Sequence, residues 1–146
     1  MVVRPARSRR ILPILTPLVI LASGTFDGVH SGHVRYLRAA RLLAKGEFLR
    51  VAVAPDVYIR TEKHREPYWS QSDRAETVLA LGCVDCVTQH PEPSVAQLIR
   101  DLRPRLFVKG QDWRGKLPED VLAACQAVGT EIVFVDTPGK HVSQAR

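Results

Sequence analysis

Residues 18–44 of the chain read LVILASGTFDGVHSGHVRYLRAARLLA, and this stretch decides the fold. It begins with an uninterrupted apolar run, residues 18–22, which is typical of a strand buried on both faces of a sheet. A turn-rich segment follows at residues 23–32. Apolar residues then recur at helical spacing over residues 33–44. A strand, a glycine-containing turn and a helix in direct succession predict the first unit of a parallel α/β sheet.

The rest of the chain repeats this alternation of short apolar runs and helical patterns. Further strands are predicted at residues 49–54, 84–88, 106–109 and 131–135. Further helices are predicted from Asp73 to near Gly82, from Ser94 to about Leu102 and from Pro118 to just before Gly129. Asp73 with Glu76, and Ser94 with Gln97, match the capping-box pattern, whereas residues 55–72 are polar and predict a loop. Five strands and four helices predict a single α/β domain, a Rossmann-like, doubly wound, five-stranded parallel sheet.

Composition is that of an ordinary globular domain, with 146 residues of which 45% are hydrophobic and 25% charged. Three cysteines are too few for a disulfide-dense scaffold. The formal net charge is +6, but Arg4, Arg7, Arg9 and Arg10 carry four of the positive charges, which leaves +2 for the remainder. Because the excess charge is concentrated in these first ten residues, a nucleic-acid partner is not expected.

The N-terminal segment has two interpretations. Its arginines followed by the apolar residues 11–22 are similar to a secretory signal peptide. Alternatively, residues 1–17 are a basic extension and residues 18–146 form the domain. The apolar run is too short to span a membrane, and Pro13 and Pro17 interrupt any helix there, so no membrane association is expected.

The segment GTFDGVHSGH, residues 24–33, carries the most informative chemistry. Its glycines allow the main chain to approach a ligand closely, and the start of a helix presents amides and a positive dipole end to an anion. His30 and His33 are three residues apart, so they share one face of a helical turn. Together these features suit phosphate binding. A pair of surface histidines, or zinc with a third ligand from elsewhere, are the alternatives.

The cysteines indicate neither a metal nor a redox site. Cys83 and Cys86 form a C-x-x-C pattern, with His90 nearby and Cys125 distant. A metal site needs a second ligand pair at a conventional spacing, and a redox pair usually opens a helix, whereas this one straddles a predicted helix end and strand start. We therefore expect ordinary thiols, no disulfide and no protein-bound metal.

GTFDGVHSGH resembles the H-x-G-H motif of the cytidylyltransferase-like nucleotidyltransferases, and the resemblance extends from about Leu18 to Ser143. Three further matches support it: Asp73-Arg74-Ala75-Glu76 leading to Val84-Asp85, Val108-Lys109-Gly110-Gln111-Asp112-Trp113, and Lys63 in the preceding loop. Of these, the segment at residues 108–113 is similar to the corresponding segment of heptose-phosphate adenylyltransferases and glycerol-3-phosphate cytidylyltransferases. Because the motif needs the strand before Gly24, cleavage near Ala22 would remove an essential element. The resemblance thus favours a cytoplasmic protein with a basic extension.

The resemblance implies transfer of AMP or CMP from ATP or CTP to a sugar- or polyol-phosphate, with release of pyrophosphate. The acceptor phosphate is already ionised and attacks directly, so no general base is needed. His30, His33 and Lys63 would stabilise the transition state, and Mg²⁺ would be held mainly by the triphosphate. The nucleotide and the phosphates would be bound by Gly24, Thr25, Phe26, Asp27, Gly32, Arg74, Lys109, Gly110, Asp112 and Ser143.

The substrate stays open between two subgroups. Residues 32–37 and 108–110 favour the heptose-phosphate type, which uses ATP, whereas residues 112–116 favour the glycerol-phosphate type, which uses CTP; we expect ATP. The oligomeric state stays open, with a homodimer as one alternative because relatives are commonly dimeric. The usual Ile-Ser-Thr-Thr-like motif and final helix are replaced by residues 141–146, where only Ser143 supplies a hydroxyl. The alternative is therefore a nucleotide-binding protein of this fold with little or no transferase activity.

Overall fold

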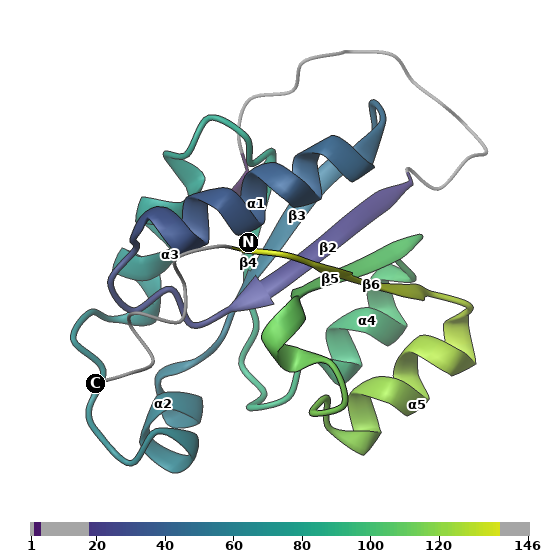
Figure 1. The fold of residues 1–146 in the computed structure, drawn as a ribbon. Coiled ribbons are helices and arrows are strands. Elements are labelled where there is room, and N and C mark those ends of the chain that lie inside the picture. The colour runs from purple at the N-terminus through teal and green to yellow at the C-terminus, as the bar shows by residue number, and fades with distance from the viewer. Residues whose placement is uncertain (1, 4–17, 138–146) are drawn as a thin grey trace.

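The computed structural model describes residues 2–3 and 18–137 of the chain. They contain a six-stranded sheet in the order β1-β4-β3-β2-β5-β6 (Figure 1). Five strands are parallel, as predicted: β2 (Val19–Gly24), β3 (Phe48–Val53), β4 (Cys86–Gln89), β5 (Leu106–Gly110) and β6 (Glu131–Val135). The sixth, β1 (Val2–Val3), pairs antiparallel with β4 at the sheet edge. It comes from the segment that the sequence assigned to a basic extension, and no pattern predicted it.

Five α-helices connect the strands, one more than predicted. They are α1 (Ser31–Ala44), α2 (Asp56–Glu62), α3 (Gln71–Leu79), α4 (Ala96–Leu102) and α5 (Glu119–Val128), with a 3₁₀ turn, η1 (Gln111–Trp113), after β5. The unpredicted helix, α2, falls in the polar stretch 55–72. It has seven residues, of which only Ile59 is buried, so it lacks the apolar periodicity from which helices are recognised.

Two predicted capping boxes are wrong. Helix α3 begins two residues earlier than Asp73, and the Ser70 hydroxyl caps it by accepting the Asp73 N–H at 3.2 Å. At α4 the N-cap is Val95, with no side-chain cap, although the Ser94 hydroxyl accepts the Ala96 N–H at 3.1 Å. In both places a hydroxyl near the helix start meets an amide, but not in the predicted register.

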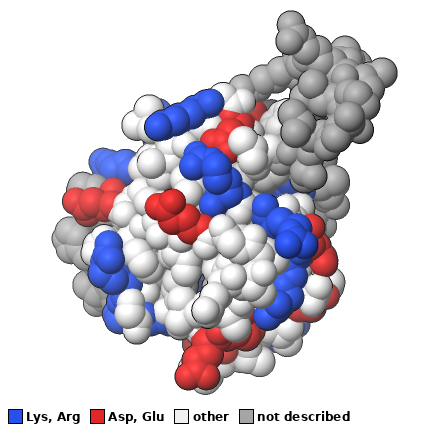
Figure 2. Space-filling model, turned by 90° about the vertical axis from the view of Figure 1, so that its right-hand side faces the viewer, with Lys and Arg blue, Asp and Glu red and all other residues white. Residues whose placement is uncertain are grey.

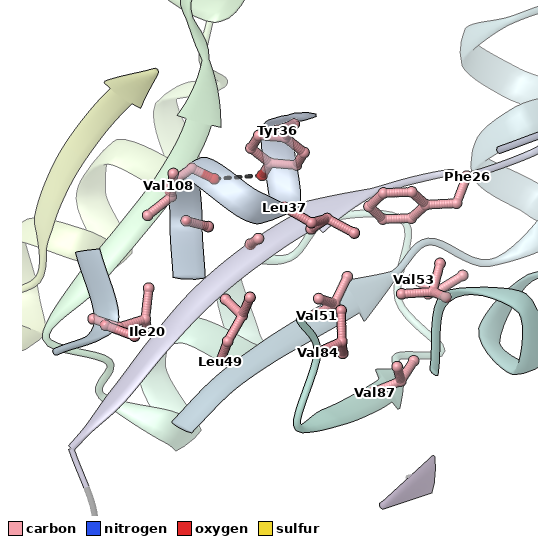
Figure 3. Close-up of a cluster of buried hydrophobic side chains, with 14 of the residues drawn as sticks. Ile20, Phe26, Tyr36, Leu37, Leu49, Val51, Val53, Val84, Val87 and Val108 are labelled. Atoms are coloured by element: carbon pink, nitrogen blue, oxygen red, sulfur yellow. Dashed lines mark hydrogen bonds between the residues drawn. The ribbon is translucent and has the colours of Figure 1, made fainter. Parts of the chain in front are cut away.

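Helices cover both faces of the sheet, which explains the continuous apolar runs in the strands. Helices α1 and α3 lie on one face and α4 and α5 on the other (Figure 1). Ile20 points to the first face, where Leu37, Leu49 and Val51 pack with it (Figure 3). Leu21, the next residue, points to the second face and packs in the cluster under α4 and α5. The doubly wound arrangement is therefore confirmed.

The strand order reverses between β2 and β5. Strand β2 pairs with β3 as far as Gly24, but with β5 only as far as Ala22 opposite Val108. Beyond that pair, Tyr36 bridges the diverging strands: its hydroxyl donates to the Val108 carbonyl (Figure 3) and accepts the Ser23 N–H at 3.1 Å. In sheets of this kind ligands bind at the carboxyl ends of the strands at such a reversal. The topology thus fixes where a site belongs.

Candidate active site

An open pocket of about 910 Å³ lies over the carboxyl ends of the parallel strands. Its walls come from the β2–α1 loop, from the segments that follow β3, β4 and β5, and from the start of α5. This volume is in the range of small-molecule sites. The pocket therefore occupies the position that the strand order predicts for a ligand.

The β2–α1 loop folds back against the end of its own strand. Phe26 adopts a positive φ of 52° and buries its ring. A Cβ on Gly24 would lie only 3.1 Å from that ring, so a larger residue there would force the ring to move. The loop reaches the start of α1 through Gly28, whose φ of 100° suits glycine. Tight backbone packing in this loop thus places the first turn of α1 over the pocket.

His30 and His33 form a capping box at the start of α1, in which each side chain accepts a backbone N–H group. The His30 Nδ1 accepts the Gly32 N–H at 3.0 Å, and the His33 Nδ1 accepts the His30 N–H at 3.2 Å. A neutral imidazole that accepts at Nδ1 carries its proton on Nε2, so both rings are N–H donors at Nε2. The ring centroids are 4.0 Å apart, and both side chains line the pocket. The predicted phosphate-binding pair is therefore brought together, with its tautomers set by the helix start.

Lys63 follows α2 directly and lines the pocket with an exposed side chain. Lys109, at the end of β5, lines the pocket from beneath and is buried. Its Nζ donates to the Ser23 carbonyl at 3.1 Å and lies 4.6 Å from the centre of the Trp113 ring. Gly110 and Asp112 continue the same wall. The structure thus assembles both predicted lysines at one pocket.

Asp27 holds a loop. Its buried carboxylate accepts the backbone N–H groups of Tyr68 and Trp69, each at 3.0 Å, and pairs with Arg65 at 2.7 Å. Burial alone would raise the pKa of Asp27, but these hydrogen bonds and the Arg65 charge outweigh it and hold the pKa below its ordinary value. A carboxylate held in this way ties residues 65–69 to the β2–α1 loop. Asp27 also lines the pocket, so its predicted part in binding the nucleotide or its phosphates stays a prediction beside this anchoring role.

Arg74 requires a correction. The resemblance implied a phosphate contact, but the guanidinium is buried and lies behind the β2–α1 loop. Its NH1 donates to the carbonyls of Thr25 at 2.7 Å and Ala54 at 2.8 Å, and its NH2 pairs with Asp56 at 2.6 Å. Its Nε donates to the Trp69 carbonyl at 3.0 Å. Arg74 therefore joins three loops that surround the pocket.

Of the remaining predicted residues, some line the pocket and others do not. Thr25 lines the pocket, whereas the Gly32 N–H is already used in capping His30. Ser143 and residues 141–146 lie outside the described residues. The pocket residues that the sequence missed include Tyr58, His90 and Ser94, which follow β3 and β4. Their position after predicted strands was the signal that could have identified them.

Metal ligands, thiols, surface charge and long apolar helices can also be located in the part of the chain that the structure describes. No group of three His, Cys, Asp or Glu residues stands close enough to hold a metal there. Cys83, Cys86 and Cys125 are free thiols. Lys and Arg are interspersed with Asp and Glu on the face in Figure 2. Of the helices in residues 2–3 and 18–137, none has the length and apolar character needed to cross a membrane.

Comparison with known proteins agrees with the site. The sequence pattern of the cytidylyltransferase-like family matches residues 21–143. A D-beta-D-heptose 1-phosphate adenylyltransferase of Bordetella bronchiseptica is 42% identical over 107 residues, covering 71% of this chain and 65% of that protein. The bifunctional protein HldE of Campylobacter curvus is 39% identical over 133 residues, covering 86% of this chain. This chain spans only 26% of that bifunctional protein.

One solved structure supports the fold. The lipopolysaccharide core biosynthesis protein of Thermoplasma volcanium superposes with a TM-score of 0.70, covering 83% of this chain and 98% of that one. Its sequence identity is 24%, so the likeness concerns the arrangement of strands and helices. The H-x-G-H segment, Lys63 and Lys109 lie within the residues matched by the family pattern.

Proposed function

The chain belongs to the cytidylyltransferase-like family, and from that premise we propose that it is an adenylyltransferase. It would transfer AMP from ATP to a sugar 1-phosphate of the heptose type and release pyrophosphate. The name of the relative from Bordetella supports this choice of nucleotide and acceptor. The glycerol-phosphate and CTP alternative is retained as an arm of the experiment below.

One observation carries the proposal. The two Nδ1 atoms of His30 and His33 accept backbone N–H groups, which makes Nε2 of each ring a donor at the pocket. Two preset N–H donors beside a helix start are suited to phosphate oxygens. The donors need no reorganisation when negative charge increases in the transition state. This arrangement favours phosphoryl chemistry over acyl transfer, which would require a nucleophile and a base.

The reaction needs alignment more than proton transfer. An oxygen of the acceptor phosphate attacks the α-phosphorus of ATP, a new P–O–P bridge forms, and the bond to the pyrophosphate breaks. The attacking oxygen is already ionised, so no side chain has to remove a proton. His30 and His33 would donate to the α-phosphate and leaving-group oxygens, while Lys63 after α2 and Lys109 in β5 supply positive charge to the pocket.

Magnesium fits this site as a companion of the nucleotide. Within the described residues no cluster of carboxylates, histidines or cysteines could enclose an ion. Mg²⁺ commonly keeps several waters and binds phosphate oxygens, so the triphosphate would bring it into the pocket. When bound, it adds charge neutralisation on the phosphates. The orientation of those phosphates is left to the histidines and lysines.

The test is a product screen of ATP and CTP against heptose 1-phosphate, other sugar 1-phosphates and glycerol 3-phosphate, with products identified by mass. We expect an ADP-sugar as the main product, and a CDP-polyol would move the enzyme to the other subgroup. Nucleotide-dependent thermal stabilisation without any product from this panel would instead identify a nucleotide-binding protein. If neither a product nor thermal stabilisation is observed, both readings of the site are refuted.

A further inference from the structure

His90 is a buried histidine that the proposed reaction does not use. It follows β4, is 4% exposed and lines the pocket. Its Nδ1 lies 2.8 Å from the Glu92 carbonyl oxygen. Because a carbonyl can only accept, Nδ1 must carry the proton, and Nε2 of the neutral ring is a hydrogen-bond acceptor. Within the described residues the ring makes this one hydrogen bond, through Nδ1, which leaves Nε2 available on a residue that lines the pocket.

The position of this ring is fixed from several sides. The Gln71 side-chain amide donates to the His90 carbonyl and to the Val53 carbonyl, each at 2.9 Å. Pro91 and Pro93 flank the next turn and restrict its backbone. Burial lowers the pKa of the His90 imidazole, although the nearby Glu92 acts in the opposite direction, so the ring stays neutral near pH 7. A neutral, immobilised acceptor is therefore preset at this place.

The surroundings of His90 differ from those of the catalytic histidines. Tyr58 and Ser94 contribute hydroxyl groups to the pocket wall beyond β3 and β4. Glu62 lies one helical turn after Tyr58 and adds a carboxylate, whose charge together with burial raises the pKa of the Tyr58 phenol. We call Tyr58, Glu62, His90 and Ser94 the hydroxyl end of the pocket. Hydrogen-bond acceptors and hydroxyls suit a polyol, whereas a carboxylate repels a phosphate.

Distance also separates this end from the phosphates. Strand β4 is two places away from β2 in the sheet, with β3 between them. Two strand spacings amount to roughly 10 Å, which is comparable to the length of a sugar phosphate. The nucleotide is expected at the reversal between β2 and β5, on the other side of β2. An acceptor whose phosphate lies beside His30 would therefore extend its sugar toward β4.

We propose that the hydroxyl end binds the sugar ring of the acceptor, and that Nε2 of His90 accepts a hydrogen bond from one sugar hydroxyl. This inference rests on the proposed function and extends it to the choice of acceptor. A site that hydrogen-bonds a substrate hydroxyl discriminates against analogues that lack it. His90 is thus a specificity residue for a polyhydroxylated acceptor.

Two substitutions separate this role from a merely structural one. His90→Asn keeps an N–H near the Nδ1 position, and hence the Glu92 contact, but loses the acceptor at Nε2. His90→Gln places its carbonyl oxygen near Nε2 and loses the Nδ1 donor. We expect His90→Asn to raise the KM for the sugar phosphate about 3- to 10-fold, with kcat and the KM for ATP nearly unchanged, and His90→Gln to raise it less.

A monodeoxy series of the accepted sugar phosphate completes the test. Wild-type protein should discriminate against one deoxy position, and His90→Asn should lose that discrimination. If His90→Asn behaves as wild type while His90→Gln is impaired, the ring only fixes the Glu92 turn and the inference is overturned. Unchanged acceptor KM in both variants overturns it as well. If wild-type protein makes no product with any acceptor, the proposed function itself is refuted, a result distinct from these.

Discussion

The start of α1 and the start of α3 both carry a residue that the family resemblance marks for phosphate binding, yet the structure uses them differently. At α1, His30 and His33 bond the backbone through Nδ1 and face the pocket. At α3, Arg74 is buried and bonds the carbonyls of the surrounding loops. Matching a motif thus identifies residues that the site needs, but not whether they contact the ligand.

The physical reason lies in burial. A guanidinium carries up to five N–H donors and is stable inside a protein only if they are matched by acceptors. Arg74 meets this condition with carbonyls from positions 25, 54 and 69 and the Asp56 carboxylate. An imidazole can divide its two nitrogens between the fold and a ligand. We therefore expect substitutions in the two regions to have different consequences.

The largest effect should come from Arg74→Met. Removing the guanidinium leaves Asp56 and three carbonyls without their partner, which we expect to lower the free energy of unfolding by about 3–5 kcal/mol. Urea unfolding measures this directly, and Arg74→Lys should recover little because an ammonium cannot reach all four acceptors. A normally stable Arg74→Met protein with a raised KM for ATP would show that Arg74 binds phosphate after all.

His30→Asn should lower activity and leave stability nearly unchanged, in contrast to Arg74→Met. Asparagine is a good N-cap, so we expect the melting temperature to stay near that of the wild type. The Nε2 donor is lost, and kcat should fall about 10²- to 10³-fold. His30→Ala is the matched control, with the same loss of kcat and an additional loss of about 1 kcal/mol of stability. Full activity of the His30→Asn protein would contradict the claim that the start of α1, unlike the start of α3, contacts the ligand.

Asp27→Asn tests the connection between the two regions. An amide would place an N–H group against donors that now meet a carboxylate, so we expect a loss of about 1–3 kcal/mol of stability. The KM for ATP should rise because the loop that follows Lys63 is no longer tied to the β2–α1 loop. Arg65→Gln removes the partly exposed ion pair but keeps the Asp27 carboxylate and its two backbone hydrogen bonds, so it should cost less than about 1 kcal/mol. Equal effects of the two substitutions would contradict the anchoring role.

The smallest effect concerns pH. Because burial lowers the pKa of His90 in the folded protein, the unfolded chain binds a proton that the folded chain does not as pH falls below about 6.5. Stability should therefore decline from pH 7.5 to 5.5, by at most about 1.4 kcal/mol per pH unit for this group. His90→Asn should have a flatter profile. The lowered pKa of Asp27 adds a further loss only at more acidic pH, below its ordinary value of 3.8. If stability depends on pH in the same way in wild-type protein and in His90→Asn, then folding does not lower the pKa of His90.

Much of the fold could be predicted because both faces of the sheet are buried. All five parallel strands lie within two residues of their predicted bounds, and Glu131–Val135 was predicted to the residue. Helix α2 escaped prediction since it is short and presents only Ile59 to the core. Strand β1 has two residues, too few for any periodicity. The sequence patterns therefore missed the elements that are too short to show an apolar periodicity.

The site was predictable to a similar degree. The histidine pair and both lysines follow from a motif and its position after strands. The role of Arg74 depends on carbonyls up to 49 residues away in sequence, which no local pattern encodes. For His90, the Glu92 carbonyl two residues away orients Nδ1, but the Gln71 side chain that fixes its backbone is 19 residues away. Side-chain roles set by distant backbone groups become visible only in the folded chain.

The rate of pyrophosphate release from ATP, with and without heptose 1-phosphate, tests the central claim most directly. Direct attack by the acceptor phosphate predicts release that requires the acceptor, matches ADP-heptose formation one for one and falls at least about 100-fold in His30→Asn. Absence of release with the acceptor, or equal release without it, would contradict the account.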